Sequence, residues 1–229
     1  MEKIKNESLI SPWIENLPFS WEPLLQIGQK ITFKKHEYIF HQDDSAEYVY
    51  IVAEGRVRLF LTSPSGDENT IAIMGEKGIL GECGAFHFSS YNSSAIAASK
   101  VTVIKISKLA FEAAVQDNHQ LARQIMMIMN IKNRILASHT TMLSNYSAVQ
   151  RICYTLLQLV HTYGVKTKDG NLIKIGFTHQ ELANLVGTSR VTVAYTMKRL
   201  ENERILQKKD NKYLIMDIDR LELFSVTSR

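Results

Sequence analysis

The N-terminal half of the chain alternates hydrophobic and polar residues over short segments. In residues 56–61, Val57, Leu59 and Leu61 fall on one face and two arginines on the other, which is the period of a half-buried strand. Similar segments rich in β-branched residues occupy 47–52, 69–74 and 101–107. Turn-forming residues at 53–55 and 64–67 separate them. Short strands at this spacing predict a β sandwich or barrel.

The period becomes helical from Lys108, with a short helix predicted over 108–117 and a longer one after it. The longer helix carries a heptad seam, made of Leu121, Ile125, Ile128, Lys132, Ile135, His139 and Met142. A second, adjacent stripe contains Ala122, Met126, Met129, Leu136, Thr140 and Leu143. One stripe can face the β domain and the other a second copy of the helix. The alternative is a helix buried on two sides of a monomer. We expect a homodimer, because a long helix between two domains has little else to bury it.

The C-terminal pattern predicts a helix-turn-helix followed by a hairpin. The polar segment 144–150 interrupts the long helix, and a new helix runs over 148–164 to Gly164. Residues 166–171 then read as a loop and 172–177 as a short strand. Thr178 and Glu181 have the spacing of a capping box, Gly187 permits a sharp turn, and Ser189 suits the N-cap of a second helix. Residues 205–216 then read as two strands around a two-residue turn. This order is that of a winged helix-turn-helix, whose second helix enters the major groove of DNA.

Several exposed side chains of this segment suit DNA. Arg190, on the first turn of the second helix, can bond guanine O6 and N7 together. Lysines near the hairpin turn can contact phosphates, which contribute affinity rather than sequence choice. The residues expected to contact DNA are Thr178, His179, Thr188, Ser189, Arg190, Val191, Thr192, Tyr195, Lys198 and Lys209.

The charge distribution favours an anionic partner for the C-terminal part. Residues 147–229 contain 13 Lys and Arg against 8 Asp and Glu, whereas residues 1–146 contain 14 against 15. Cys83 and Cys153 are the only cysteines, too few for a disulfide framework or a zinc site. No leader pattern and no apolar run of about 18 residues is present. We therefore expect a cytoplasmic protein in a reducing compartment, without a membrane association.

From about residue 28 to about 220 the chain resembles the Crp/Fnr family of bacterial transcription regulators. The segments that carry the resemblance are 38–60, 81–86, 148–159 and 185–206. The resemblance implies an α+β protein with three parts: a cyclic-nucleotide-binding-type β jelly roll with short flanking helices (1–117), a dimerisation helix (118–144) and a winged helix-turn-helix DNA-binding domain (145–229). It also implies a homodimer on a near-palindromic double-stranded operator, RNA polymerase as a partner, and control by a small-molecule effector.

The resemblance also indicates which effector is not expected. Cyclic-AMP binders of the family hold the ribose with a glycine–glutamate pair, matched by Gly81 and Glu82, and the cyclic phosphate with an arginine and a serine. Here 91–96 offers Asn92, Ser93 and Ser94 instead of the arginine, so charged hydrogen bonds to a phosphate are missing. The expected effector-binding residues are Gly81, Glu82, Cys83, Ser93, Ser94, Leu136 and Ala137; the last two replace a threonine–serine pair that reads adenine. A mostly apolar or aromatic acid fits this pocket better than cyclic AMP, and the effector stays unknown.

The family comparison shapes the expected operator as well. Arg190 matches the guanine-reading arginine of the family. The next position often holds a glutamate that accepts from cytosine, and Val191 stands there instead, where it can pack on a thymine methyl group. Tyr195 replaces a further arginine of the cyclic-AMP receptor protein. An A/T-rich half-site with one guanine is therefore expected.

Three other functions would each need particular residues of this chain. A haem-based gas or redox sensor of the same family would use His87 or Cys83 as the axial ligand, whereas two cysteines cannot hold an iron–sulfur cluster. A cyclic-nucleotide-binding module could act through protein contacts. An enzyme would need Cys83 or Ser93 as nucleophile with His87 as base, and neither pair has an orienting third group. We expect no enzyme, no required cofactor and no metal site.

Overall fold

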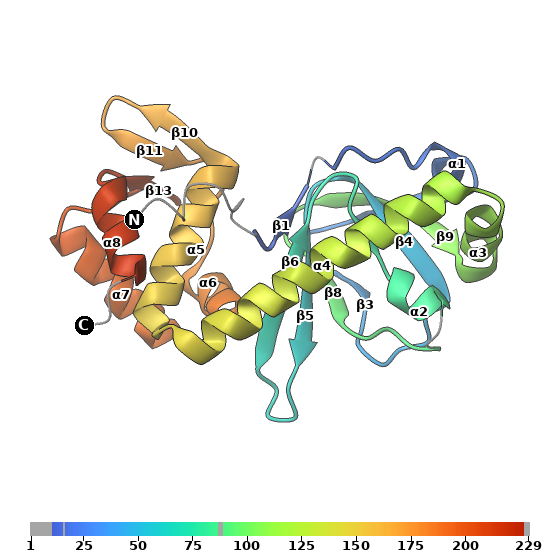
Figure 1. Ribbon diagram of the computed structural model, residues 1–229, viewed down its shortest axis with the longest axis horizontal. Coiled ribbons are helices and arrows are strands. Elements are labelled where there is room, and N and C mark those ends of the chain that lie inside the picture. Colours follow the sequence, from blue (N-terminus) through green and yellow to red (C-terminus); the bar gives the residue numbers. More distant parts are fainter. Residues whose placement is uncertain (1–10, 16, 87–88, 227–229) are drawn as a thin grey trace. The chain divides into compact units, whose positions relative to one another are not determined.

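The computed structural model describes residues 11–15, 17–86 and 89–226, which form two compact units (Figure 1). Residues 12–136 make up the β unit. Residues 137–226 together with Ser11 make up the helix-turn-helix unit. The division between them falls inside one long helix, α4 (His119–Asn145). The domain limits expected at 117/118 and 144/145 stay predictions.

The β unit contains two sheets. The strands of the first, in spatial order, are β1 (Trp13–Ile14), β6 (Glu68–Met74), β5 (Val57–Thr62), β8 (Ser94–Ala97) and β3 (Tyr38–Phe40). Those of the second are β2 (Gln29–Phe33), β9 (Val101–Ser107), β4 (Tyr48–Glu54) and β7 (Ile79–Leu80). Phe40 of the first sheet stacks on Tyr50 of the second, with ring centroids 5.7 Å apart. The two sheets therefore pack face to face, as the alternating pattern predicted.

One detail of the strand prediction is wrong. Leu61 was expected on the buried face with Val57 and Leu59, but it is 39% exposed and Phe60 is buried instead. The pairing of β5 with β6 shifts its register between Leu59 and Phe60. The extra residue of this bulge is Ile71 of β6, and the alternation of faces along β5 breaks at the same point, where Leu59 and Phe60 are both buried.

The helices that the structure describes in the β unit are α1 (Glu22–Leu25), α2 (Glu82–Phe86), α3 (Lys108–Gln116) and the first part of α4. The heptad seam of α4 faces the β unit, since Leu121, Ile125, Ile128 and Ile135 are buried. The side-chain amide of Gln124 forms two hydrogen bonds with the backbone of Ser20. Its oxygen accepts from the Ser20 nitrogen at 2.9 Å, and its nitrogen donates to the Ser20 carbonyl at 2.9 Å. The second stripe of the helix stays on the surface.

The helix-turn-helix unit begins where the chain breaks α4. Ser147 and Gln150 form a capping box that starts α5 (Ala148–Tyr163), so the predicted interruption is confirmed. The remaining helices are α6 (His179–Val186), α7 (Arg190–Asn202) and α8 (Ile218–Val226). A four-stranded sheet has the order β10 (Gly164–Thr167), β11 (Gly170–Ile173), β13 (Lys212–Ile215) and β12 (Leu206–Lys209). The predicted hairpin around Asp210–Asn211 is confirmed, with Lys209 paired to Lys212.

The segment before α6 differs from its prediction. Residues 166–171 were expected as a loop and 172–177 as a strand. The structure instead has a hairpin of β10 and β11, and the second strand ends at Ile173. Asn171 and Leu172 pair with β13, and this tertiary pairing fixes a strand that local sequence alone leaves undecided.

Candidate DNA-binding surface and effector cradle

Local capping defines both helices of the DNA-reading motif. The Thr178 hydroxyl accepts from the Glu181 amide and the Glu181 carboxylate accepts from the Thr178 amide, so α6 starts with a reciprocal capping box. Ser189 caps α7 by accepting from the Thr192 amide. Between the helices Gly187 has a left-handed backbone, with φ of 65°, and a Cβ atom there would lie 2.8 Å from Leu143. The left-handed backbone therefore favours glycine at this turn.

The N-terminal half of α7 presents its side chains to solvent. Arg190 is exposed on the first turn. Val191 is 77% exposed and Tyr195 is 71% exposed, and these two lie four residues apart on one face of the helix. On the opposite face Val193, Met197 and Leu200 are buried. The apolar side of α7 thus packs in the core of the unit, and the side chains of Arg190, Val191 and Tyr195 are exposed to solvent.

The other predicted contact residues are distributed around this helix. Thr188 and Thr192 are half-buried, and the Thr192 hydroxyl lies 2.9 Å from that of Ser189. Lys198 and Lys209 are exposed and lie 3.6 Å from Glu201 and 3.7 Å from Asp169, respectively. Such exposed pairs contribute little stability and leave both lysines available to phosphates.

His179 joins α6 to the hairpin. Its Nε2 lies 3.1 Å from the Tyr213 hydroxyl, and the Tyr213 ring stacks on Phe177. Burial, then the positive charges of Lys208 and Arg190, lower the pKa of His179. Lys208 of β12 and Arg190 of α7 therefore act on a histidine at the start of α6, and the Glu201 carboxylate acts in the opposite direction.

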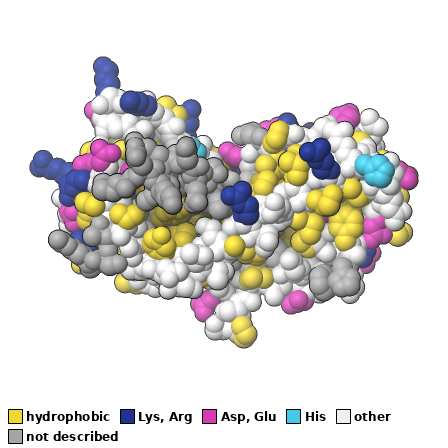
Figure 2. Space-filling model, viewed as in Figure 1, with side chains coloured by type: hydrophobic (Ala, Val, Ile, Leu, Met, Phe, Trp, Pro, Cys, Tyr) yellow, Lys and Arg dark blue, Asp and Glu magenta, His cyan; other side chains and the backbone are white. Residues whose placement is uncertain are grey.

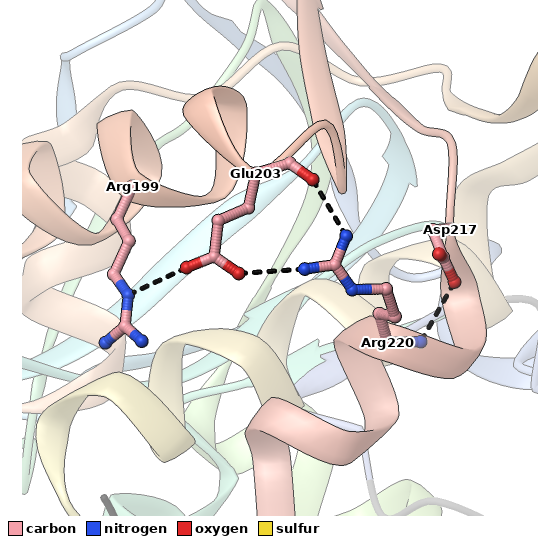
Figure 3. Close-up of polar contacts among 4 residues, drawn as sticks. All are labelled: Arg199, Glu203, Asp217 and Arg220. Atoms are coloured by element: carbon pink, nitrogen blue, oxygen red, sulfur yellow. Dashed lines mark hydrogen bonds and ion pairs between the residues drawn. The ribbon is translucent and has the colours of Figure 1, made fainter.

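The C-terminal half of α7 is fastened to α8, as Figure 3 shows. The Glu203 carboxylate accepts from Arg199 Nε at 3.0 Å and from Arg220 Nη2 at 2.9 Å. Arg220 Nη1 donates to the Glu203 carbonyl at 2.9 Å, and Arg199 lies over the Phe224 ring. Arg199 therefore braces the C-terminal end of α7 through these contacts.

The predicted effector residues gather in part around α2 of the β unit, and we call Gly81, Glu82 and Lys132 the effector cradle. Gly81 has a left-handed φ of 80° and turns the chain into α2. The Glu82 side chain that follows is only 1% exposed, and its carboxylate lies 2.6 Å from Lys132 Nζ. Lys132 also donates to the Ile79 carbonyl at 2.9 Å. The carboxylate that the family offers to a ribose is therefore ion-paired within this chain.

Ser93 and Ser94 are both buried at the start of β8. The Ser94 hydroxyl accepts from the Gln42 amide at 2.9 Å, and the Ser93 hydroxyl lies 3.4 Å from the amide oxygen of Asn92. Leu136 and Ala137 are exposed on α4. Lys132 was missed as a member of this cluster, although a lysine within an apolar heptad seam was the signal for a buried partner.

Cys83 and His87 were the candidates for haem ligation or nucleophilic chemistry. Burial, then the neighbouring Glu82 carboxylate, raises the pKa of the Cys83 thiol to about 11. The thiol is thus protonated at neutral pH and is a weak nucleophile. His87 lies outside the described residues. Within those that the structure describes, no three His, Cys, Asp or Glu side chains gather as a metal site would require.

The second stripe of α4 is an exposed apolar surface. Met126 is 63% exposed, and Met129, Leu136 and Leu143 are 40–47% exposed. In Figure 2 hydrophobic side chains gather on the surface along which α4 runs in Figure 1.

Among the helices that the structure describes, none is long and apolar enough to cross a bilayer.

Comparison with known proteins identifies both units. Residues 30–118 match the cyclic nucleotide-binding domain, and residues 150–224 match the Crp-like helix-turn-helix domain. A CRP-like cAMP-activated global transcriptional regulator of Mycobacterium tuberculosis is 25% identical over 84% of this chain and 86% of its own. The cyclic AMP receptor protein of Thermus thermophilus is 29% identical over 80% and 82%. The global nitrogen regulator of Nostoc is 27% identical over 76% and 79%.

Solved structures agree on the fold. The c-di-GMP responsive global regulator CLP of Xanthomonas campestris superimposes with a TM-score of 0.78 at 19% identity, covering 85% of this chain and 96% of its own. CprK complexed with OCPA gives a TM-score of 0.73 at 20% identity, covering 94% and 98%. Together with the two domain matches, these likenesses confirm the α+β architecture of a β jelly roll, a long helix and a winged helix-turn-helix. The chain belongs to the Crp/Fnr family and is a DNA-binding transcription regulator with an N-terminal effector-binding domain.

Proposed function

We propose that the protein acts as a homodimer on a near-palindromic operator and that a small molecule other than cyclic AMP controls it. The observation that carries the operator part is the free N-terminal face of α7, where Arg190, Val191 and Tyr195 are exposed. Two such helices spaced by one turn of DNA, ~34 Å, would match two half-sites. RNA polymerase, as the partner of a transcription regulator, belongs to the same proposal.

The dimer is supported by the second stripe of α4. Met126 and Met129 are largely exposed although they lie on a long helix whose other face is buried. A helix with apolar residues on two sides needs a second partner, and a copy of itself supplies the same heptad spacing. Analytical ultracentrifugation of the whole chain should therefore give a dimer, and a monomer at micromolar concentration would contradict it.

The operator is proposed to be A/T-rich with one guanine per half-site. The exposed guanidinium of Arg190 could bond guanine O6 and N7, and its neighbour Val191 has no group that could accept from cytosine. The aliphatic Val191 and the ring of Tyr195 suit the methyl group of thymine. His179, Thr178 and the hairpin lysines would hold phosphates.

Selection of bound duplexes from a random pool tests this proposal. The recovered sequences should share an inverted repeat. Arg190→Ala should weaken binding to the best sequence by about 1–3 kcal/mol and relax the choice of one base pair. Lys168→Ala, which removes an exposed charge in the β10–β11 turn, is the matched control. Unchanged affinity and base preference in Arg190→Ala would show that the role given to Arg190 is wrong.

The effector part is supported by the state of the cradle. The segment 91–96, in which the resemblance to cyclic-AMP binders would lead one to expect an arginine, contains none, and the Glu82 carboxylate is ion-paired with Lys132. Without a guanidinium the cyclic phosphate would lose its charged hydrogen bonds. A calorimetric titration with cyclic AMP should therefore give no binding heat at concentrations up to about 1 mM. A dissociation constant of about 1 mM corresponds to a binding free energy of about 4 kcal/mol. Saturable binding at micromolar concentrations would return cyclic AMP as the effector.

A further inference from the structure

Arg151, in the first turn of α5, makes three hydrogen bonds to backbone carbonyls from two separate segments. Its Nη1 donates to the Tyr146 carbonyl at 2.7 Å, in the junction between α4 and α5. Its Nε donates to Val186 at 2.7 Å and its Nη2 to Gly187 at 3.0 Å, at the end of α6. We propose that Arg151 is a positioning residue for DNA reading, because it fastens the turn before the recognition helix to the junction of α4 and α5. This inference rests on the proposed function.

The chemistry of these bonds suits a lasting connection. Val186 and Gly187 carry carbonyls at the C-terminal end of α6, where the helix dipole places negative charge. A guanidinium is permanently charged and presents its donors in a fixed planar fork, so one side chain can serve both of these carbonyls and that of Tyr146. A lysine has one donor atom and cannot hold three carbonyls with the same geometry.

The same corner contains a second contact between these segments. Gly187 lies so close to Leu143, in the last turn of α4, that an added Cβ would come within 2.8 Å of its Cδ2. His139, one turn earlier on α4, lies close enough to Arg151 for its charge to help lower the pKa of His139, after the larger effect of burial. His139 therefore stays neutral near pH 7 and does not repel the guanidinium.

The position of the turn determines where α7 points. Arg190, the first residue of α7, follows Gly187 by three residues, and Ser189 caps the helix in between. A shift of the turn relative to the junction would therefore displace the exposed end of α7, which carries Arg190 and Val191. Arg151 resists that shift without lying on the exposed face of α7. A movement of the last turn of α4 would reach the recognition helix through the same three carbonyls.

The inference predicts a particular pattern of DNA binding. Arg151→Lys keeps the positive charge and Arg151→Ala removes it, and both should weaken binding to the selected operator about tenfold to hundredfold. The slope of log affinity against log salt should stay as in the wild type, because no phosphate contact is lost. Lys198→Ala is the matched comparison, since loss of a phosphate contact lowers that slope by about one.

A double-substitution cycle separates positioning from a general loss of stability. If Arg151 acts by placing Arg190, the Arg151→Ala change should cost less than about threefold in an Arg190→Ala background, since neighbouring effects through one element are not additive. Circular dichroism at the assay temperature checks that each variant is folded. Additive losses, or a reduced salt slope in Arg151→Lys, would overturn the inference. A wild-type protein that binds no selected duplex would instead refute the proposed function.

Discussion

The recognition helix and the effector cradle treat their polar side chains in opposite ways. At the start of α7, Arg190 is exposed beside Val191 and Tyr195, which are 77% and 71% exposed. In the cradle, Glu82 is 1% exposed and its carboxylate already lies 2.6 Å from Lys132. The resemblance to the family makes both Arg190 and Glu82 candidates for ligand binding, yet only Arg190 is exposed to solvent.

A residue at a position where the family binds ligands can bind one in this chain only if its polar group is available. A side chain on an exposed helix face keeps its water-bound donors until a partner replaces the water. A buried carboxylate with an internal cation must give up that pairing before a ligand can use it, and the exchange costs the energy of the pair. Arg190 can therefore bind a ligand group without losing an internal partner. A ligand of Glu82 would have to compete with Lys132 for the carboxylate.

The largest expected effect comes from breaking the pair in the cradle. Lys132→Met leaves the Glu82 carboxylate buried without a cation and should lower the free energy of unfolding of the β unit by about 3–5 kcal/mol. Trp13 and Trp21, the two tryptophans of the chain, are both buried in the β unit. Urea unfolding followed by tryptophan fluorescence therefore reports this unit.

The double variant Lys132→Met with Glu82→Gln is the control for that measurement. It removes both charges, so most of the lost stability should return. If Lys132→Met alone unfolds at the urea concentration of the wild type, the pair does not hold the cradle. The ion pair would then not distinguish the Glu82 carboxylate from the exposed groups of α7.

The same contrast explains which features the sequence could predict. Thr178 with Glu181, and Ser189, determine helix starts through bonds that span three residues, and the structure confirms these caps. Lys132 and Glu82 are 50 residues apart, and the three carbonyls held by Arg151 include two that are 35 and 36 residues away. Such contacts depend on how elements pack. Local spacing therefore predicted the motif and missed the groups that hold it in place.

A smaller effect should come from the methyl groups of thymine. Val191 and Tyr195 are placed four residues apart on the exposed face of α7, where apolar groups gain by covering a methyl group. Replacing one thymine of a half-site by uracil removes only that methyl group. Affinity should fall by about 0.8 kcal/mol, or about fourfold, at the position that Val191 contacts. Competition binding with single substitutions along the half-site measures this loss.

Val191→Ala provides the matched control for the uracil series. Its affinity for the thymine operator should fall, and it should no longer distinguish thymine from uracil at the affected position. If this variant loses as much affinity on the uracil substitution as the wild type does, Val191 does not contact the methyl group. Val191 would then contribute nothing to the choice of operator sequence.

The smallest expected effect concerns pH and the edge of the DNA-reading surface. Burial, followed by Lys208 and Arg190, lowers the pKa of His179 in the free protein, so its imidazole is neutral at pH 7. A phosphate brought close by DNA would raise that pKa, and binding would take up a proton. Affinity should therefore rise as the pH falls from about 7.5 to 6, by about threefold, and level off below the pKa of the free protein.

His179→Gln tests this linkage because glutamine can still bond the Tyr213 hydroxyl, which lies 3.1 Å from His179 Nε2, but does not titrate in this range. The Glu201 carboxylate raises the pKa of His179 in opposition to the two cations, and it is unchanged in the variant. His139 also titrates, but it packs beside Arg151 rather than beside the DNA-reading face. Anisotropy titrations at constant ionic strength should show the pH dependence in the wild type and a flat profile in His179→Gln. An equal slope in both proteins would assign the proton to another group and remove His179 from the surface that holds phosphate.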